Sequence, residues 1–239
     1  MTNCVPRIKQ TGSYAIYCSL FIFIIYGVLF NIPDLHGQPL PNPFDNNPSW
    51  ILKKQKDGIK VYSLPWTDSD VLVFKADTVI NTPLSPLLAL MVDIDHYVRW
   101  IGGCKGSKVL HKLSDTEYIG HVLINGILIF RDRDFIVHAK GFQDPESKIV
   151  SVRYTSLDGY LSKSRGTVRV TDNQGSWTIV PLAENRVRLI WQGRLDPGGW
   201  FPTWLLRLLM DTVVLSTMQD IISEVKKDRY QNAIFEGFK

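Results

Sequence analysis

The chain has 239 residues, a formal net charge of +4 at pH 7 and a hydrophobic fraction of 45%. Its Lys and Arg residues are interleaved with acids, whereas a nucleic-acid binder usually carries a basic stripe, so we expect no nucleic-acid partner. Only Cys104 lies beyond the first 35 residues. A single cysteine excludes a disulfide within the folded part and a cysteine-rich zinc site there.

The front of the chain is apolar. Residues 14–30 contain no charged side chain and follow Arg7 and Lys9. This length lies between that of a secretory signal and that of a minimal membrane span. Because the basic side is N-terminal, the remainder is expected on the outer side of the membrane. We therefore predict that residues 1–35 are a signal peptide or an N-terminal membrane anchor, and that the domain is exported, either periplasmic or membrane-anchored.

A proline-rich linker and a single domain follow. Four prolines fall within residues 36–48, which predicts an extended tether. One domain is expected over residues 49–232, with a C-terminal tail at 233–239. At its start, residues 50–57 are predicted as a short helix that Gly58 ends.

The next elements are two strands and a helix. Residues 59–63 and 71–80 have the composition of strands. Cap residues and prolines at 81–86 predict the start of a helix, whose apolar residues run from Leu87 to Val98.

A run of strands follows this helix. We expect strands at 108–112, 117–123, 127–139, 149–155, 166–171, 175–181 and 186–195. Apolar residues recur at every second position in two of them: Val150, Val152 and Tyr154, and Val187, Leu189 and Trp191. Such alternation is typical of an antiparallel sheet with one wet face.

The chain ends in one long helix. Pro202 suits a first helical turn, and nothing breaks a helix from there to Arg229. At 1.5 Å per residue it reaches roughly 40 Å, enough to cross a domain. The element order predicts an α+β fold in which a curved antiparallel sheet grips this C-terminal helix across an apolar space.

The two halves of this helix differ in pattern. Met218, Ile221, Ile222 and Val225 form one apolar stripe, and Arg207 and Asp211 project on the same side in the first half. Either the helix bends near residues 212–214, or Arg207 and Asp211 face the cavity. In the second case, apolar residues of the first half would face outward with Trp200, Phe201 and Trp204 as a membrane-facing gate.

Four stretches, in this order, carry a resemblance to a known family. They are an acidic pair followed by tryptophan at 93–100, the Arg133-Asp134-Phe135 motif in a strand, a late hairpin at 175–181, and the turn into the last helix at 196–202. Over residues 49–230 the chain resembles the START (StAR-related lipid-transfer) family of the helix-grip superfamily, as a bacterial-type exported member.

The resemblance implies a tunnel that holds one lipid. Family members carry sterols, phospholipids, ceramide or other hydrophobic molecules between membranes without chemistry. Steroid carriers place a buried acid before the Arg-Asp-Phe strand and a buried arginine after it. The corresponding positions here are near Val122 and Ala139, both apolar. His121, Asn125 and His138 are the nearest substitutes, and the Arg207–Asp211 pair is another.

Twelve residues are candidates for lipid binding. They are Trp100, His121, Asn125, Phe135, His138, Tyr154, Trp177, Trp191, Arg207, Met210, Asp211 and Val214. The alternative for His121 and His138 is a hydrogen-bonded core histidine, and for the aromatic members it is plain core packing.

Catalytic motifs are missing from the sequence. It contains no nucleophile elbow, no His-Glu-x-x-His and no P-loop, and Asp93 with His96 gives only two of the ligands a metal needs. We expect a non-catalytic monomer without a cofactor or metal, whose partners are a lipid and a membrane surface. The alternatives are a helix-grip cyclase, aromatase or hydrolase with His121 or His138 as base, and a scaffold whose side chains fill the cavity.

Overall fold

The computed structural model describes residues 49–64, 71–127 and 129–238. These residues belong to one compact unit. The predicted signal or anchor segment (1–35) and linker (36–48) lie outside them. Within the described ranges, no helix has the length and apolarity needed to cross a membrane.

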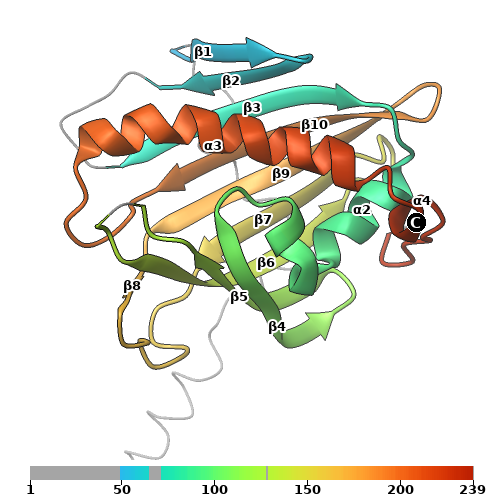
Figure 1. Ribbon diagram of the computed structural model, residues 1–239. Helices are drawn as coiled ribbons and strands as arrows, with labels where there is room; N and C mark the ends of the chain where they lie inside the picture. Colours follow the sequence, from blue (N-terminus) through green and yellow to red (C-terminus); the bar gives the residue numbers. More distant parts are fainter. Residues whose placement is uncertain (1–48, 65–70, 128, 239) are drawn as a thin grey trace, which may run out of the picture. The chain divides into compact units, whose positions relative to one another are not determined.

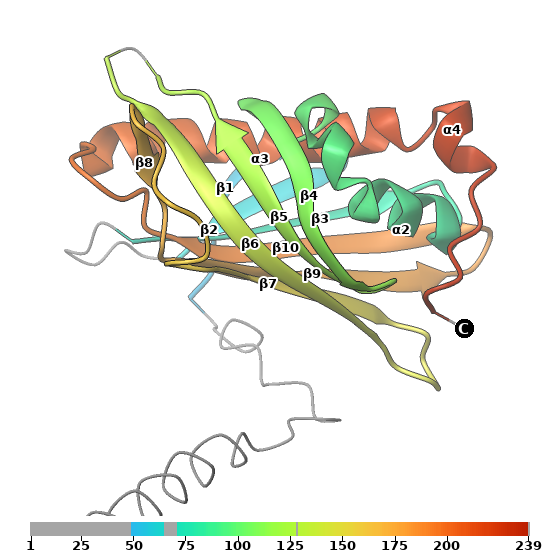
Figure 2. The same cartoon turned by 90° about the horizontal axis from the view of Figure 1, so that it is seen from below.

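The described strands form a single curved sheet (Figures 1 and 2). Its order is β1-β2-β3-β10-β9-β7-β6-β5-β4, and neighbours along this path are antiparallel, while β8 pairs in parallel with β6. The strands are β1 (Ile51–Lys56), β2 (Ile59–Ser63), β3 (Leu72–Ile80), β4 (Cys104–Ser114), β5 (Glu117–Ile124), β6 (Asp132–Gln143), β7 (Val150–Ser156), β8 (Thr167–Arg169), β9 (Asn173–Leu182) and β10 (Arg186–Leu195).

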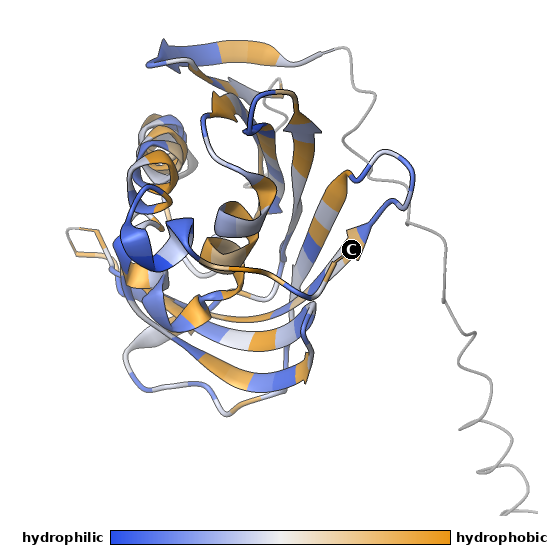
Figure 3. Cartoon of the chain, turned by 90° about the vertical axis from the view of Figure 1, so that its right-hand side faces the viewer, coloured by the Kyte–Doolittle hydropathy of each residue, from blue (hydrophilic) through white to orange (hydrophobic). Residues whose placement is uncertain are grey.

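Within the described ranges, four helical segments accompany the sheet. They are α2 (Leu84–Val92), the 3₁₀ helix η1 (Ile94–Arg99), α3 (Thr203–Glu224) and α4 (Asp228–Gln231). Viewed roughly along α3, the sheet curves around α3 and α2 (Figure 3). The predicted α+β fold, with a curved sheet gripping a long C-terminal helix, is confirmed.

The predicted helix at residues 50–57 is wrong, because this segment is strand β1. It pairs with β2, so that Ile51 lies opposite Ser63. The turn between them is Asp57-Gly58, and both residues have positive φ, 52° and 78°. Asp-Gly favours this two-residue hairpin turn, and it forces the chain back onto itself as a strand.

The helix predicted to end near Trp100 is interrupted at Asp93. The α-helix stops at Val92, and a 3₁₀ helix continues to Arg99. The strand predicted from residue 127 begins only at Asp132. The carboxylate of Asp132 accepts a hydrogen bond from the Gly126 amide at 2.7 Å, which holds the connection between β5 and β6 closed.

Helix α3 runs without interruption from Thr203 to Glu224, and buried residues on both sides of 212–214 share one face. Leu206, Val214, Met218, Ile221 and Val225 are all buried, and they project onto one broad face. The hairpin β1–β2 also contacts α3: Lys54 Nζ donates to Thr212 Oγ1 at 2.5 Å, and Gln219 Nε2 donates to Asp57 at 2.8 Å.

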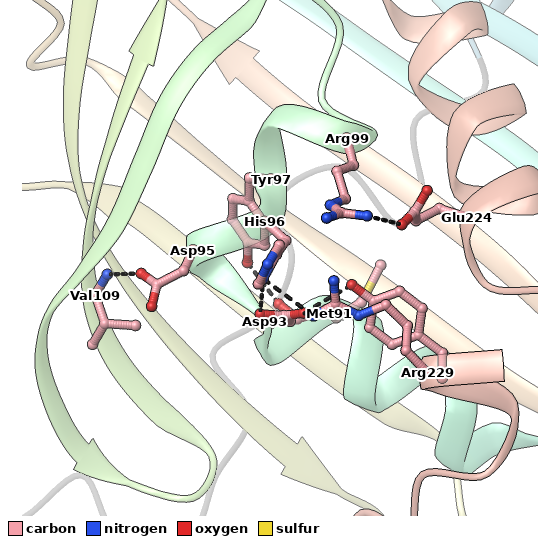
Figure 4. A network of polar contacts seen from close by, with 10 residues as sticks. Met91, Asp93, Asp95, His96, Tyr97, Arg99, Val109, Glu224 and Arg229 are labelled. Atoms are coloured by element: carbon pink, nitrogen blue, oxygen red, sulfur yellow. Dashed lines mark hydrogen bonds and ion pairs between the residues drawn. The ribbon is translucent and has the colours of Figure 1, made fainter. Parts of the chain in front are cut away.

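The last helix is shorter than the predicted one. It ends at Glu224, Lys227 adopts an extended backbone, and α4 follows. This break returns Tyr230 to Asp93, to which its hydroxyl donates at 2.8 Å, while Arg229 donates to the same carboxylate (Figure 4). The network therefore fastens the C-terminal end of the chain to the start of η1.

The predicted boundary at residue 232 falls inside a packed region. Phe235 and Phe238 pack against the core cluster. The Phe235 amide donates to Ser85 Oγ at 2.6 Å. Gly141 lets Phe238 approach the sheet, since a Cβ there would lie 2.7 Å from its ring.

Candidate functional site

A cavity of about 360 Å³ lies between α3 and the curved sheet. Its wall comes from η1, from strands including β5, β6, β9 and β10, and from the first part of α3. Most of the wall is apolar. This volume and lining are typical of a site for a hydrophobic small molecule.

Strand alternation decides which side chains form the wall. On β6, Arg133, Phe135, Val137 and Ala139 line the cavity, and on β5 Val122 does so with its neighbours two residues away. Val122 and Ala139, near which the family resemblance puts the acid and the arginine of steroid carriers, therefore both lie in the wall and are apolar.

Seven of the twelve candidate residues line the cavity. They are Trp100, Asn125, Phe135, Tyr154, Trp177, Trp191 and Met210. The other five do not: His121, His138, Arg207, Asp211 and Val214. Val214 is fully buried in the core.

His121 and His138 lie on strands that line the cavity, as expected, but neither side chain belongs to its wall. His121 Nε2 lies 3.7 Å from Asp134, and burial lowers the pKa of His121 against the opposing effect of that carboxylate. His138 Nε2 lies 2.8 Å from Glu117, which also pairs with Lys140 at 3.1 Å. Burial alone would raise the pKa of Glu117, but these two hydrogen-bonded partners outweigh it and lower the pKa. Both histidine side chains lie on the face of the sheet that is turned away from the cavity.

The expectation that Arg207 and Asp211 supply the polar end of the cavity is wrong. Burial raises the pKa of Asp211, while Lys53 and Lys54 of β1 oppose the shift. Neither Arg207 nor Asp211 belongs to the wall of the cavity.

Aromatic residues form one part of the wall. Trp177 and Trp191 stack with ring centroids 4.5 Å apart, and Trp100 meets Trp177 edge-on at 6.1 Å. The hydroxyl of Tyr154 accepts a hydrogen bond from Trp191 Nε1 at 2.9 Å, and burial raises its pKa. The side chain of Tyr154 passes over Gly175, where a Cβ would lie 2.4 Å from its hydroxyl oxygen.

Arg133 is a wall residue that the sequence-based candidate set missed. Its side chain is buried, Nη1 donates to the Arg131 carbonyl at 2.7 Å, and the guanidinium carbon lies 4.8 Å from the centre of the Phe201 ring. The signal for it was present, because Arg133 is two residues from Phe135 in a strand and must share its face.

Two further wall residues carry polar atoms of note. Trp100 Nε1 is buried and donates to no atom of the described residues. Thr217 Oγ1 accepts a hydrogen bond from the Gly102 amide at 3.0 Å, which ties α3 to the end of η1.

Aromatic side chains meet where α3 begins. Phe130, from the β5–β6 connection, lies 4.5 Å from Phe201 and 5.7 Å from Trp200 between ring centroids. We call these three residues the aromatic cluster. Phe201 lines the cavity, so the cluster stands at its boundary.

Exposed apolar residues adjoin this cluster in the chain. Ile129, Trp200, Trp204 and Leu208 are 85%, 78%, 67% and 67% exposed, and we call them the apolar patch. The outward orientation expected for the first half of α3 holds for Trp204 and Leu208. Leu209, in contrast, lines the cavity. The described residues contain no group of three or more metal-ligating side chains.

Comparison with known proteins places this architecture in a family. The profile described as "Polyketide cyclase / dehydrase and lipid transport" matches residues 80–222, more than half of the chain. An uncharacterized protein of Pseudomonas aeruginosa is 25% identical over 179 residues, covering 74% of this chain and 87% of its own length. Phosphatidylcholine transfer protein of Rattus norvegicus is 22% identical over 188 residues, covering 77% and 86%.

A solved structure has the same architecture. The STAR-related lipid transfer protein of Xanthomonas axonopodis superposes with a TM-score of 0.69 at 24% identity, covering 75% of this chain and 99% of that one. The chain therefore belongs to the polyketide cyclase / dehydrase and lipid transport family, and it has the fold of STAR-related lipid transfer proteins that its four sequence motifs predicted.

Proposed function

We propose that this chain binds one lipid in the cavity beneath α3 and transfers it between membranes without chemical change. The observation that carries the proposal is the wall itself: it is largely apolar, encloses about 360 Å³ and includes no histidine or carboxylate among the described residues. The similarity in sequence to a phosphatidylcholine transfer protein supports the same function.

An enzyme of this fold would need a general base in the cavity wall. His121 and His138, the two candidates for that role, face away from the cavity and pair with Asp134 and Glu117. A general base must come within hydrogen-bond reach of the proton it removes. The geometry therefore favours binding and transfer over cyclase or hydrolase chemistry.

The apolar patch supports docking on a membrane surface. A lipid must enter and leave without crossing water, so the cavity boundary has to meet the bilayer. The patch exposes two tryptophans, whose rings favour the membrane interface. It also adjoins the aromatic cluster, one member of which, Phe201, lines the cavity.

The N-terminal segment would set where this transfer takes place. We propose that residues 1–35 export the domain or anchor it on the outer side of the membrane, on the basis of their uncharged run after Arg7 and Lys9. Cell fractionation of the full chain, with mass spectrometry of its mature N-terminus, tests export and distinguishes a cleaved signal from an anchor. Full-length protein in the cytosol would reject the proposal.

Lipid binding and transfer are tested on the purified full-length chain. Organic extracts analysed by mass spectrometry should contain a co-purifying lipid in about equimolar amount. Fluorescent lipid should then move from donor to acceptor liposomes faster than without protein. The absence of bound lipid and of transfer across phospholipids, sterols and fatty acids would reject the function. A mass measurement in solution checks the expected monomer.

A further inference from the structure

Among the described residues, the cavity wall contains one charged side chain, that of Arg133. Only 8% of its surface is exposed. The acidic residues on either side of it in β6 point away and are already engaged. Asp134 pairs with Arg169 at 2.6 Å, and Asp132 pairs with Lys105. Within the described part of the chain, Arg133 forms no ion pair with a carboxylate.

Backbone carbonyls and an aromatic ring hold the guanidinium of Arg133. Nη1 donates to the Arg131 carbonyl at 2.7 Å, and Nε approaches the Pro197 carbonyl at 3.5 Å. Phe201 covers one side, at 4.8 Å from the guanidinium carbon. No described residue accepts a hydrogen bond from Nη2. The side chain is therefore fixed in place while part of its donor fork remains available.

A buried cation without a counter-ion is costly. Taking a guanidinium out of water is unfavourable unless an anion and hydrogen bonds replace the lost hydration. Burial, with a smaller contribution from the Arg131 cation, lowers the pKa of Arg133, which is the direction expected for an uncompensated charge. A carboxylate or phosphate bound to the fork would form charge-assisted hydrogen bonds and remove this cost.

The position of Arg133 fits the polar end of an amphiphile. It lies against Phe201, at the boundary formed by the aromatic cluster, while the rest of the wall is mostly apolar. The wall also offers a second donor, Trp100 Nε1, without a described acceptor. Excess donors and no carboxylate favour a ligand that brings hydrogen-bond acceptors of its own.

We propose that the lipid carried by this chain has a carboxylate or phosphate at its polar end, and that Arg133 binds this group beneath the aromatic cluster while the chains extend into the apolar cavity. This inference rests on the proposed function and names the class of its ligand. The neutral ends of a sterol, an alcohol or a diacylglycerol would leave the Arg133 charge uncompensated.

The test is a competition between matched lipids. Full-length protein is incubated with phosphatidylcholine vesicles that contain equal amounts of palmitic acid, hexadecanol, phosphatidic acid and diacylglycerol. The protein is re-isolated, and its bound lipids, phosphatidylcholine included, are counted by mass spectrometry. Palmitic acid against hexadecanol isolates a carboxylate, and phosphatidic acid against diacylglycerol isolates a phosphate.

We expect the wild type to enrich at least one anionic lipid over its neutral counterpart by about tenfold or more. Hydrogen bonds to charged groups contribute about 1.5–3 kcal/mol, and a tenfold ratio corresponds to about 1.4 kcal/mol. Arg133→Gln should lower this enrichment by about tenfold without lowering uptake of the neutral lipid. Arg133→Lys should keep part of it, because it retains the charge but loses the fork.

The matched control is Arg131→Gln, which removes an exposed cation two residues away and should behave as the wild type. Circular dichroism establishes that each variant is folded. A wild type that takes anionic and neutral lipids equally overturns the inference without any variant, and so does an Arg133→Gln variant with unchanged preference. If the wild type takes up none of the lipids offered, the inference is overturned too, and the wider panel with sterols described above decides separately whether the proposed function also fails.

Discussion

Single residues set the shape of the cavity wall, and Gly175 is the clearest case. Gly175 of β9 lies directly opposite Tyr154 of β7, and the tyrosine side chain packs over it. A Cβ there would lie 2.4 Å from both the Tyr154 hydroxyl oxygen and the Gln192 carbonyl oxygen. The tyrosine could swing away, but the carbonyl belongs to the neighbouring strand and cannot move alone.

We predict that Gly175→Ala destabilises the protein by at least about 2 kcal/mol, because overpacking at a site bounded by backbone forces the strands apart. It should also reduce lipid loading, since Tyr154 lines the cavity. Urea unfolding and bound-lipid mass measure the two effects. Gly106→Ala in β4 is the control, because nothing lies within 4 Å of its Cβ position. Equal stability of the two variants would contradict the prediction.

The sequence pattern indicates the aromatic part of the wall but not its charged residue. Trp177, Trp191 and Tyr154 were found because aromatic residues in strands with one buried face tend to face the core. Arg133 was missed because an arginine in a strand is usually placed on the wet face. On β6 both alternating sets contain apolar residues, and Ile136 on the outer face is fully buried. The apolar pattern of β6 alone therefore could not say which set faces α3, although the choice of Phe135 as a cavity residue already implied Arg133 on the same face.

At the scale of elements, the end of the chain fastens the helices to one another. Tyr230 and Arg229 of α4 both donate hydrogen bonds to the carboxylate of Asp93, the residue that separates α2 from η1. Tyr230 is buried, and burial, followed by the hydrogen bond to Asp93, raises its pKa. The hydroxyl therefore stays protonated and remains a donor.

We predict that Tyr230→Phe lowers the free energy of unfolding by about 1–2 kcal/mol, since it removes a buried hydrogen bond and leaves Asp93 with one donor fewer. Chemical denaturation measures the change. Tyr160→Phe, which removes the hydroxyl of an exposed tyrosine, should be nearly neutral. The proposed role of Asp93 as a joint between helices would be rejected if both variants were as stable as the wild type.

The start of α3 is the element on which membrane docking depends. Trp204→Asp with Leu208→Asp should reduce binding to liposomes by at least about tenfold, because each exposed apolar side chain buried in a bilayer contributes about 1.5–3 kcal/mol. Since both side chains are 67% exposed, the fold should be unaffected. Liposome flotation and thermal unfolding measure the two quantities.

The control for docking is the pair Leu113→Asp with Ile234→Asp, which removes apolar side chains that are 50% and 85% exposed. Ile234 follows α4 in the chain, and α4 lies at the opposite end of α3 from the start of that helix (Figure 1). A control variant that loses binding as strongly as the patch variant would show that docking does not use this surface.

At the scale of the whole molecule, His121 couples stability to pH. Burial holds its pKa below the ordinary value of about 6.5. The unfolded chain therefore binds a proton more readily than the folded one near pH 6. The contribution to stability is fully present above pH ~6.5 and is lost as the pH falls through the lower folded pKa.

We predict that the free energy of unfolding decreases between pH 7.5 and 5.5, and that His121→Gln makes this decrease smaller. Denaturant titrations at the two pH values measure it. The exposed His111 provides the control substitution, His111→Gln, which should leave the decrease as in the wild type. A His121→Gln variant with the full wild-type pH dependence would contradict the assignment.

The sequence by itself determined the element order from β2 onward, the long last helix and the apolar character of the site. Pro202 and the uninterrupted run after it specify α3, and strict alternation in β7 and β10 specifies strands with one buried face. These signals are local, because helix and strand periods and turn residues act within a few positions. The Asp57-Gly58 turn was just as local, and the helix predicted at 50–57 overlooked it.

Only the tertiary structure decided which faces meet. It turned His121 and His138 outward, placed Arg207 and Asp211 outside the cavity wall, and brought Arg133 under Phe201. These outcomes depend on the register of the paired strands and on the packing of the β1–β2 hairpin against α3. The contacts between the hairpin and α3 join residues far apart in the chain. A strand pattern gives two faces but does not say which one the helix will cover, because that choice belongs to the packing of the whole domain.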